Sequence, residues 1–407
     1  MKKTTTIGAI CLMLLPLIYL QCKKSNLTDA RGSLYAGSAT CIKCHSNIYH
    51  SYLHTAHYLA SLPASPENIH GSFAANENIF QFSPSQKIVM EKRANALFQT
   101  YYQNGKVVES RRFDIVMGGV KGESYLYWNG NGLNQLPASY YTKEHEWLLS
   151  PRFDPRYVNF NRTITSRCLQ CHASYIGDQP GEAQGLKTAE QFDKSTLIYS
   201  IDCERCHGPG AQHVSYQMSN PGIKTARFIA RYSSLPRARR LDMCAVCHSG
   251  NKSEMLQSTF SFVPGDTLAN FKLPGYENAA NDGKLDVHGN QLQLLQSSKC
   301  FINSKMDCAT CHDVHQNQRN NTVAFVQKCL GCHSIATHNY CQMAGKLSTP
   351  FLNSNCIACH MPAFASVAIV ASAYNKTPSA NVLVTSHHIA IYPDEVKKIL
   401  AMAQKNK

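Results

Sequence analysis

The chain has 407 residues, with 18 cysteines, 18 histidines and a formal net charge of +14. The length suffices for one large domain or two ordinary ones. The cysteine and histidine contents are both high, so any interpretation that accounts for only one of them is excluded. A positive net charge of this size, taken alone, suggests nucleic acid or an anionic surface as a partner.

The first segment, residues 1–21, has the pattern of a secretory signal peptide. Lys2 and Lys3 precede an apolar run over residues 7–20, which is too short to span a bilayer and fits a signal sequence. The alternative is a buried helix of the core. We expect an exported protein, located in the periplasm or at the outer membrane.

Cys22 ends this segment and resembles the lipidation site of bacterial lipoproteins. The usual signal has a leucine three residues before the cysteine and a small residue directly before it, whereas Tyr19 and Gln21 stand there. We expect a lipid anchor at Cys22. The rest of the sequence contains no long apolar run either, so no membrane-spanning segment is expected.

The next two segments differ in amino-acid composition and pattern. Residues 23–72 contain the first of several Cys-x-x-Cys-His motifs. Residues 73–145 contain no cysteine and consist of short β-like runs, with Asn104-Gly105 as a strong hairpin signal. We expect a small antiparallel β-meander inserted at this place.

Residues 146–393 contain six further copies of the motif, and a short basic helix is expected over residues 394–407. The seven motifs contribute the cysteines Cys41, Cys44, Cys168, Cys171, Cys203, Cys206, Cys244, Cys247, Cys308, Cys311, Cys329, Cys332, Cys356 and Cys359. Their histidines are His45, His172, His207, His248, His312, His333 and His360.

The spacing within the motif is what covalent haem attachment needs. Two thiols separated by two residues reach the two vinyl groups of one porphyrin, and the following histidine directs its imidazole at the iron. Structural zinc is the rival interpretation, but zinc sites pair two half-sites and do not require an adjacent histidine. A disulfide framework also leaves that histidine unexplained. The motifs therefore predict seven covalently bound haem c groups, each with its iron.

Haem also accounts for the charge. Cleavage of the signal removes Lys2 and Lys3 and reduces +14 to +12. Each haem brings two propionates, so seven haems cancel much or all of the excess, and nucleic-acid binding is not expected. Of the four cysteines outside the motifs, Cys11 belongs to the signal and Cys22 is the lipid site. The other two, Cys300 and Cys341, form either a disulfide or two small buried thiols.

Eleven histidines outside the motifs are candidates for the sixth ligand of each iron. His213 lies six residues after His207, and His315 lies three after His312. Side chains three apart on a helix share a face, whereas two ligands of one iron lie on opposite porphyrin faces. We therefore expect both to serve a neighbouring haem. The further candidates are one of His54 and His57, one of His387 and His388, and His288.

The chain resembles multihaem cytochromes c related to the tetrahaem electron carrier of nitrifying bacteria. It resembles octahaem hydroxylamine oxidoreductases and pentahaem nitrite reductases more distantly. The stretches that carry the resemblance are Ile201–His213, Ser297–Phe301, Cys308–His315, Cys356–Pro362 and Thr385–His387. In that family, residues at the positions of His213, His315 and His387 are distal ligands. The chain departs from the family in its number of motifs, and all seven motifs end in histidine.

These observations predict a mainly helical or irregular multihaem cytochrome fold with little regular secondary structure, apart from the β-meander. The expected function is electron transfer through closely packed bis-histidine haems. The partners would be other cytochromes or a membrane quinol-oxidising complex. The alternative is a reductase or other oxidoreductase that acts on a small nitrogen or sulfur compound at a five-coordinate haem.

Overall fold

The computed structural model of the protein describes residues 29–179, 190–250, 252–273, 285–337, 340–373 and 376–405. The predicted signal peptide, residues 1–21, and the predicted lipid site, Cys22, lie outside these residues. None of the helices in the described ranges combines the length and the apolar character that a membrane crossing requires.

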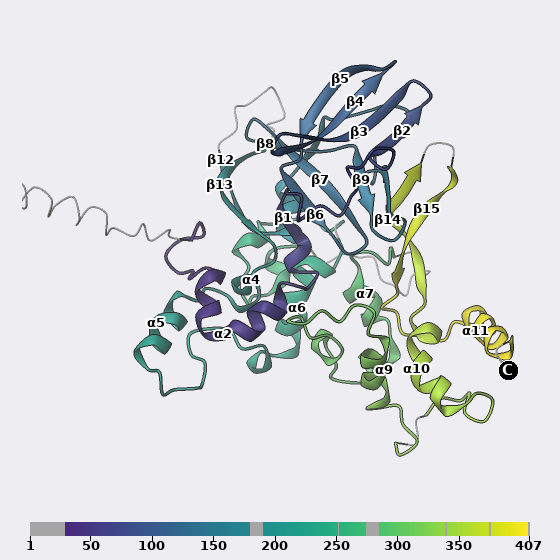
Figure 1. Cartoon of the computed structure of the whole chain (residues 1–407). Coiled ribbons are helices and arrows are strands. Elements are labelled where there is room, and N and C mark those ends of the chain that lie inside the picture. The colour runs from purple at the N-terminus through teal and green to yellow at the C-terminus, as the bar shows by residue number, and fades with distance from the viewer. Residues whose placement is uncertain are drawn as a thin grey trace, which may run out of the picture.

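Two regions of different construction make up the molecule. The sheets occupy one side, and the short helices with their connecting turns occupy the other (Figure 1). The hairpin β14–β15, which comes late in the sequence, runs beside the sheets and leads back into the helical region (Figure 1).

One sheet has four antiparallel strands in the order β2-β3-β4-β5. The strands are β2 (Ile79–Ser83), β3 (Gln86–Arg93), β4 (Ala96–Gln103) and β5 (Lys106–Arg112). Apolar side chains such as Ile88 and Met90 alternate with polar ones, which gives the sheet one buried face. The predicted hairpin turn is confirmed, because Gln103 pairs with Lys106 and both Asn104 and Gly105 have positive φ.

A larger sheet packs against the first. Its main path is β1-β6-β7-β9-β10-β14-β15, with β8 attached to β7 and β11 attached to β8. The bounds are β1 (Ser61–Pro63), β6 (Ile115–Gly118), β7 (Gly122–Asn129), β8 (Gly132–Gln135), β9 (Ala138–Tyr141), β10 (Glu146–Leu149), β11 (Arg162–Ile164), β14 (Ala363–Ala373) and β15 (Lys376–Thr385). A separate two-stranded sheet joins β12 (Ala173–Gln179) to β13 (Gln191–Tyr199).

The main hydrophobic core lies between the four-stranded and the larger sheet. Ile88 and Met90 of β3 meet Tyr125 of β7 and Leu149 of β10 in one buried cluster. Trp147 lies at the centre of its aromatic side chains, within 5.4 Å of the ring centres of both Tyr125 and Tyr140. This core holds the β region together.

The helical region consists of short segments. The α-helices are α2 (Ser38–Tyr52), α3 (Ser166–His172), α4 (Cys203–His207), α5 (Ala211–Ser219), α6 (Arg237–His248), α7 (Gln291–Gln296), α8 (Lys299–Ile302), α9 (Thr322–Leu330), α10 (Thr349–His360) and α11 (Pro393–Lys405). The 3-10 turns are η1 (Tyr58–Ala60), η2 (Tyr232–Ser234), η3 (Thr259–Ser261), η4 (Leu268–Asn270) and η5 (Cys308–Thr310). The apolar cluster of this region in the described residues is small and centres on Val246, Phe262 and Phe271.

The expected fold class was wrong. Regular structure is abundant, and the strands form several antiparallel sheets rather than one small meander. The sheet extends beyond residues 73–145 because β1, β11, β14 and β15 pair with it from elsewhere in the chain. Long-range pairing of this kind leaves no local sequence signal.

Candidate haem-binding sites

Each described motif forms a helical turn that ends at its histidine. Four of the histidines, namely His172, His207, His248 and His360, are the last residues of α3, α4, α6 and α10. In α2 the helical conformation breaks at His45, which has φ −112° and ψ 38°. In the fifth and sixth motifs the backbone N–H of the histidine donates a hydrogen bond to the backbone carbonyl of the first cysteine, at 2.9 and 2.8 Å respectively. This turn places both thiols and the imidazole on one face.

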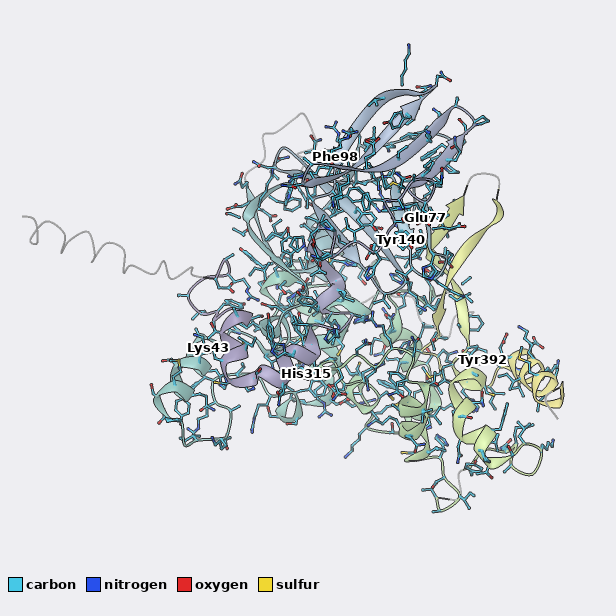
Figure 2. The ribbon with its side chains drawn as sticks, viewed as in Figure 1. Lys43, Glu77, Phe98, Tyr140, His315 and Tyr392 are labelled. Carbon is cyan, nitrogen blue, oxygen red and sulfur yellow. The ribbon has the colours of Figure 1, made fainter. Side chains whose placement is uncertain are left out.

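Three motif histidines face a second imidazole from another part of the chain. The ring centres of His45 and His213 are 6.4 Å apart, with 20° between the planes. The second pair, His207 and His315, is 5.9 Å apart at 15°. The third pair, His312 and His387, is 6.2 Å apart at 24°. Figure 2 shows His315 within the helical region, where the motif turns gather.

These separations fit a six-coordinate iron between the two rings. A metal–imidazole bond is about 2 Å long, and a ring centre lies about 1 Å behind its ligating nitrogen, so two axial imidazoles have centres about 6 Å apart. Each of the three pairs has this separation and nearly parallel planes. The residues present therefore fit a haem with two axial histidines.

A fourth pair consists of His57 and His248, whose ring centres are 6.3 Å apart with the planes at 76°. Burial lowers the pKa of His57 to about 4, and the charge of His248 acts in the same direction. His54, the other candidate of this segment, is exposed. The neutral imidazole that burial favours is the form that binds a metal.

His172 of the second motif lies near His288. Burial lowers the pKa of His172, and the charge of His288 contributes to this shift. Burial likewise lowers the pKa of His288. The structure thus brings the isolated candidate His288 close to the motif that precedes it by more than a hundred residues.

Backbone carbonyls orient several of these imidazoles. The Nδ1 atoms of His172 and His207 lie 3.2 Å from the carbonyl oxygens of Ala60 and Ala230 respectively. A carbonyl beside Nδ1 fixes the tautomer with the proton there and leaves Nε2 as the metal ligand. The same arrangement occurs at His213 with Arg227 at 2.9 Å, and at His360 with Ala390 at 2.9 Å.

Residues 143–208, which include the second and third motifs, match the family described as "Cytochrome c554 and c-prime". The polyhaem c-type cytochrome OmcB of Geobacter sulfurreducens is 26% identical over 216 residues, which cover 43% of this chain and 26% of OmcB. OmcC of the same organism is 27% identical over 174 residues, covering 37% of this chain and 20% of OmcC. The match thus spans about a quarter or less of the length of these relatives.

The crystal structure of the outer cell wall cytochrome OcwA has a similar fold. It superimposes with a TM-score of 0.52 over 90% of this chain and 81% of OcwA, at 18% sequence identity. The chain is a multihaem c-type cytochrome. Its cysteine motifs have the sequence by which c-type cytochromes attach haem covalently.

Attachment motifs of this cytochrome that are distant in sequence touch one another. The side chains of Cys41 and Cys203, from the first and third motifs, are in hydrogen-bonding contact. The same holds for Cys171 with Cys247, for Cys244 with Cys308, and for Cys329 with Cys356. These contacts place the second motif beside the fourth, the fourth beside the fifth, and the sixth beside the seventh.

Among the described residues, the two cysteines outside the motifs are Cys300 and Cys341, and both are free thiols in the structure. Cys300 lies near Cys332 of the sixth motif, and Cys341 lies near Cys359 of the seventh. The disulfide between Cys300 and Cys341 is therefore not formed.

Sequence reasoning missed an ionic cluster that joins the first and third motifs. The Glu204 carboxylate accepts hydrogen bonds from the backbone N–H groups of Ala36 and Gly37, each at 2.8 Å, just before the first motif. It also accepts from the N–H of Gly210 at 2.7 Å. A glutamate between the two cysteines of a motif was a visible signal, but its partners could not be read from the sequence.

Proposed function

We propose that the chain is an exported heptahaem cytochrome c that transfers electrons between redox proteins through closely packed haems. One observation carries the proposal. Three motif histidines face imidazoles from other segments, at the separation that two axial ligands of one iron require. The bound haem iron supplies the one-electron chemistry. The chain supplies the attachment, the axial ligands and the spacing.

We assign five of the axial pairs from these contacts. His45, His207 and His312 are paired with His213, His315 and His387, and His248 and His172 are paired with His57 and His288. Two axial histidines at each iron favour a six-coordinate, low-spin haem with a low reduction potential. The partner of His333 is left open, since His338, the nearest other histidine in sequence, lies outside the described residues.

Two of the assigned ligands connect one haem to the next. His213 follows the third motif but would bind the iron at the first, and His315 follows the fifth motif but would bind the iron at the third. Each such residue ties one haem to the backbone that holds the next. Together with the contact between Cys41 and Cys203, this arrangement supports a continuous path from the first motif through the third to the fifth. The contact between Cys244 and Cys308 places the fourth motif beside this path.

The proposed location is the cell envelope, with a lipid anchor at Cys22. The signal-like residues 1–21 support export, and OcwA, whose fold is similar, is an outer cell wall cytochrome. The electron donors and acceptors would be other cytochromes or a membrane quinol-oxidising complex. Neither nucleic acid nor a soluble metabolite is required.

Two measurements test the proposal. The intact mass of the mature protein, made in a host that attaches haem c, should exceed the polypeptide mass by seven haems. The EPR spectrum of the ferric protein should be dominated by low-spin haem. Fewer than seven haems, or high-spin signal at most sites, would contradict the heptahaem electron carrier.

A second candidate function has one specific observation in its favour. Among the described residues, no ring contact joins His360 of the seventh motif to another histidine, although its Nδ1 is fixed by the carbonyl of Ala390. An open position at this iron would allow a small nitrogen or sulfur compound to bind and react. High-spin signal from this haem together with turnover of nitrite or hydroxylamine would favour the reductase over the carrier.

A further inference from the structure

Lys272 is a buried lysine in the helical region. It is 7% exposed, follows η4 and pairs through its backbone with Met255. Its ammonium nitrogen lies 3.4 Å from the hydroxyl of Ser249, the residue directly after the His248 ligand. In the described part of the chain, no carboxylate forms an ion pair with it.

A second cation lies at the same place. The Arg205 side chain donates to neutral oxygens, namely the carbonyls of Thr259 and Gln170 and the Thr259 hydroxyl. Its Nε atom is buried without a hydrogen-bond partner. Arg205 also forms no ion pair with a carboxylate of the described residues, in contrast to Arg31, which contacts three.

Both cations act on the junction between the second and fourth motifs. Cys171 and Cys247 touch each other there. Arg205 donates to the carbonyl of Gln170, the residue before Cys171, and Lys272 reaches the hydroxyl of Ser249, two residues after Cys247. In the haem-bound protein these two sulfurs are neutral thioethers. The negative charges near the two cations in the haem-bound protein are therefore those of the haems, propionates included.

A buried cation stabilises any negative charge that appears near it. Reduction of a ferric haem adds one negative charge to the site. We propose that Lys272 and Arg205 form an electropositive junction that raises the reduction potentials of the haems at the second and fourth motifs. This pair then holds the first electrons that enter the cytochrome. The proposal rests on the proposed electron-transfer function.

The test uses the full haem-loaded protein and a redox titration followed by optical and EPR spectra. Lys272→Met removes the charge and keeps the length of the side chain, whereas Lys272→Arg keeps the charge. At a fixed ambient potential, Lys272→Met should lower the ratio of reduced to oxidised haem at the affected sites about tenfold, which corresponds to about 59 mV for a one-electron couple. Lys272→Arg should retain most of the wild-type ratio.

A matched control is Lys224→Met, which removes an exposed lysine from the same region and should leave the titration unchanged. A second background, His57→Ala, makes the fourth-motif haem high-spin and thereby identifies it. In this background, Lys272→Met should lower the potential of the high-spin haem.

Unchanged potentials in Lys272→Met with all haems attached would overturn the proposal, as would an equal shift in Lys224→Met. If both Lys272→Met and Lys272→Arg lose haem, the residue has a packing role, and this result would also overturn the proposal. Absence of a high-spin signal in His57→Ala would instead contradict the ligand assignment. The full titration curves of Lys272→Met and wild type would still decide the role of the cations.

Discussion

Arg31 and Asp202 form a buried ion pair, with Nη2 of the arginine 2.7 Å from Oδ2 of the aspartate. Asp29 and Glu204 complete the cluster around the same guanidinium. Burial alone would lower the pKa of Arg31, but its hydrogen bonds to Asp29 and Asp202 raise it above the ordinary value. The cluster ties the segment before the first haem motif to the residues that begin the third.

Removal of this cation should destabilise the protein strongly. Arg31→Met leaves three carboxylates in a site where their side chains are 8%, 7% and 1% exposed, and breaking one partner out of a buried pair costs about 3–5 kcal/mol. We expect a clearly lower unfolding temperature by circular dichroism. The control is Arg156→Met, which breaks an exposed pair with Asp154 and should change the unfolding temperature little. Equal effects of the two substitutions would argue against the cluster.

Substitution of a proposed distal ligand should change one haem only. His213→Ala removes the imidazole that faces His45, so the first-motif haem should lose its sixth ligand and become high-spin while its thioethers keep it attached. The EPR spectrum should show one new high-spin haem, and the intact mass should still include all the haems. The exposed His54 provides the control, since His54→Ala should leave the spectrum unchanged. A wholly low-spin spectrum in His213→Ala would refute the assignment.

The buried ligands also predict the direction of the pH dependence. Burial lowers the pKa of both His57 and His387 to about 4, from the ordinary 6.5. The unfolded chain therefore binds more protons than the folded protein between about pH 6.5 and 4. Protonation of each group in the folded protein would therefore cost about 3 kcal/mol more than in the unfolded chain, so the stability falls as the pH drops through this window.

Coordination to iron opposes protonation of these histidines as well. The low-spin spectrum should therefore persist at about pH 5.5, where a free imidazole is mostly protonated, and should give way to a high-spin spectrum only below about pH 4. An acid titration followed by absorbance and circular dichroism checks both effects. Loss of the low-spin spectrum near pH 6.5 would contradict the buried, coordinated state.

The core between the two sheets has no room for an added methyl group at Gly71. A Cβ atom there would overlap the Trp147 ring, whose indole N–H donates to the carbonyl of Ser72 at 2.8 Å. Gly71→Ala should therefore lower the free energy of unfolding by about 1–3 kcal/mol, as measured by denaturant titration. Gly222→Ala meets no atom within 4 Å and serves as the control. A neutral Gly71→Ala would indicate that the tryptophan can move aside.

Much of the candidate site was visible in the sequence because it is local. The two cysteines and the histidine of each motif lie within one helical turn, so five consecutive residues are enough to predict the attachment chemistry. The same reasoning, from three-residue spacing on a helix, predicted that His315 serves a haem other than its own, and the structure places it opposite His207. The Asn104-Gly105 turn was also readable, since it depends on the conformations of two adjacent residues.

Tertiary structure decided what local patterns do not encode. The sequence could not choose between His54 and His57, because the contact with His248 depends on how the segment between α2 and η1 packs against the end of α6. It also failed to predict the large sheet, since β14 joins β10 by pairing Ser372 with Leu149 across more than two hundred residues. Short sequence motifs are thus sufficient to predict covalent haem attachment. The partner of each imidazole and the charges around each motif are decided only when distant segments pack together.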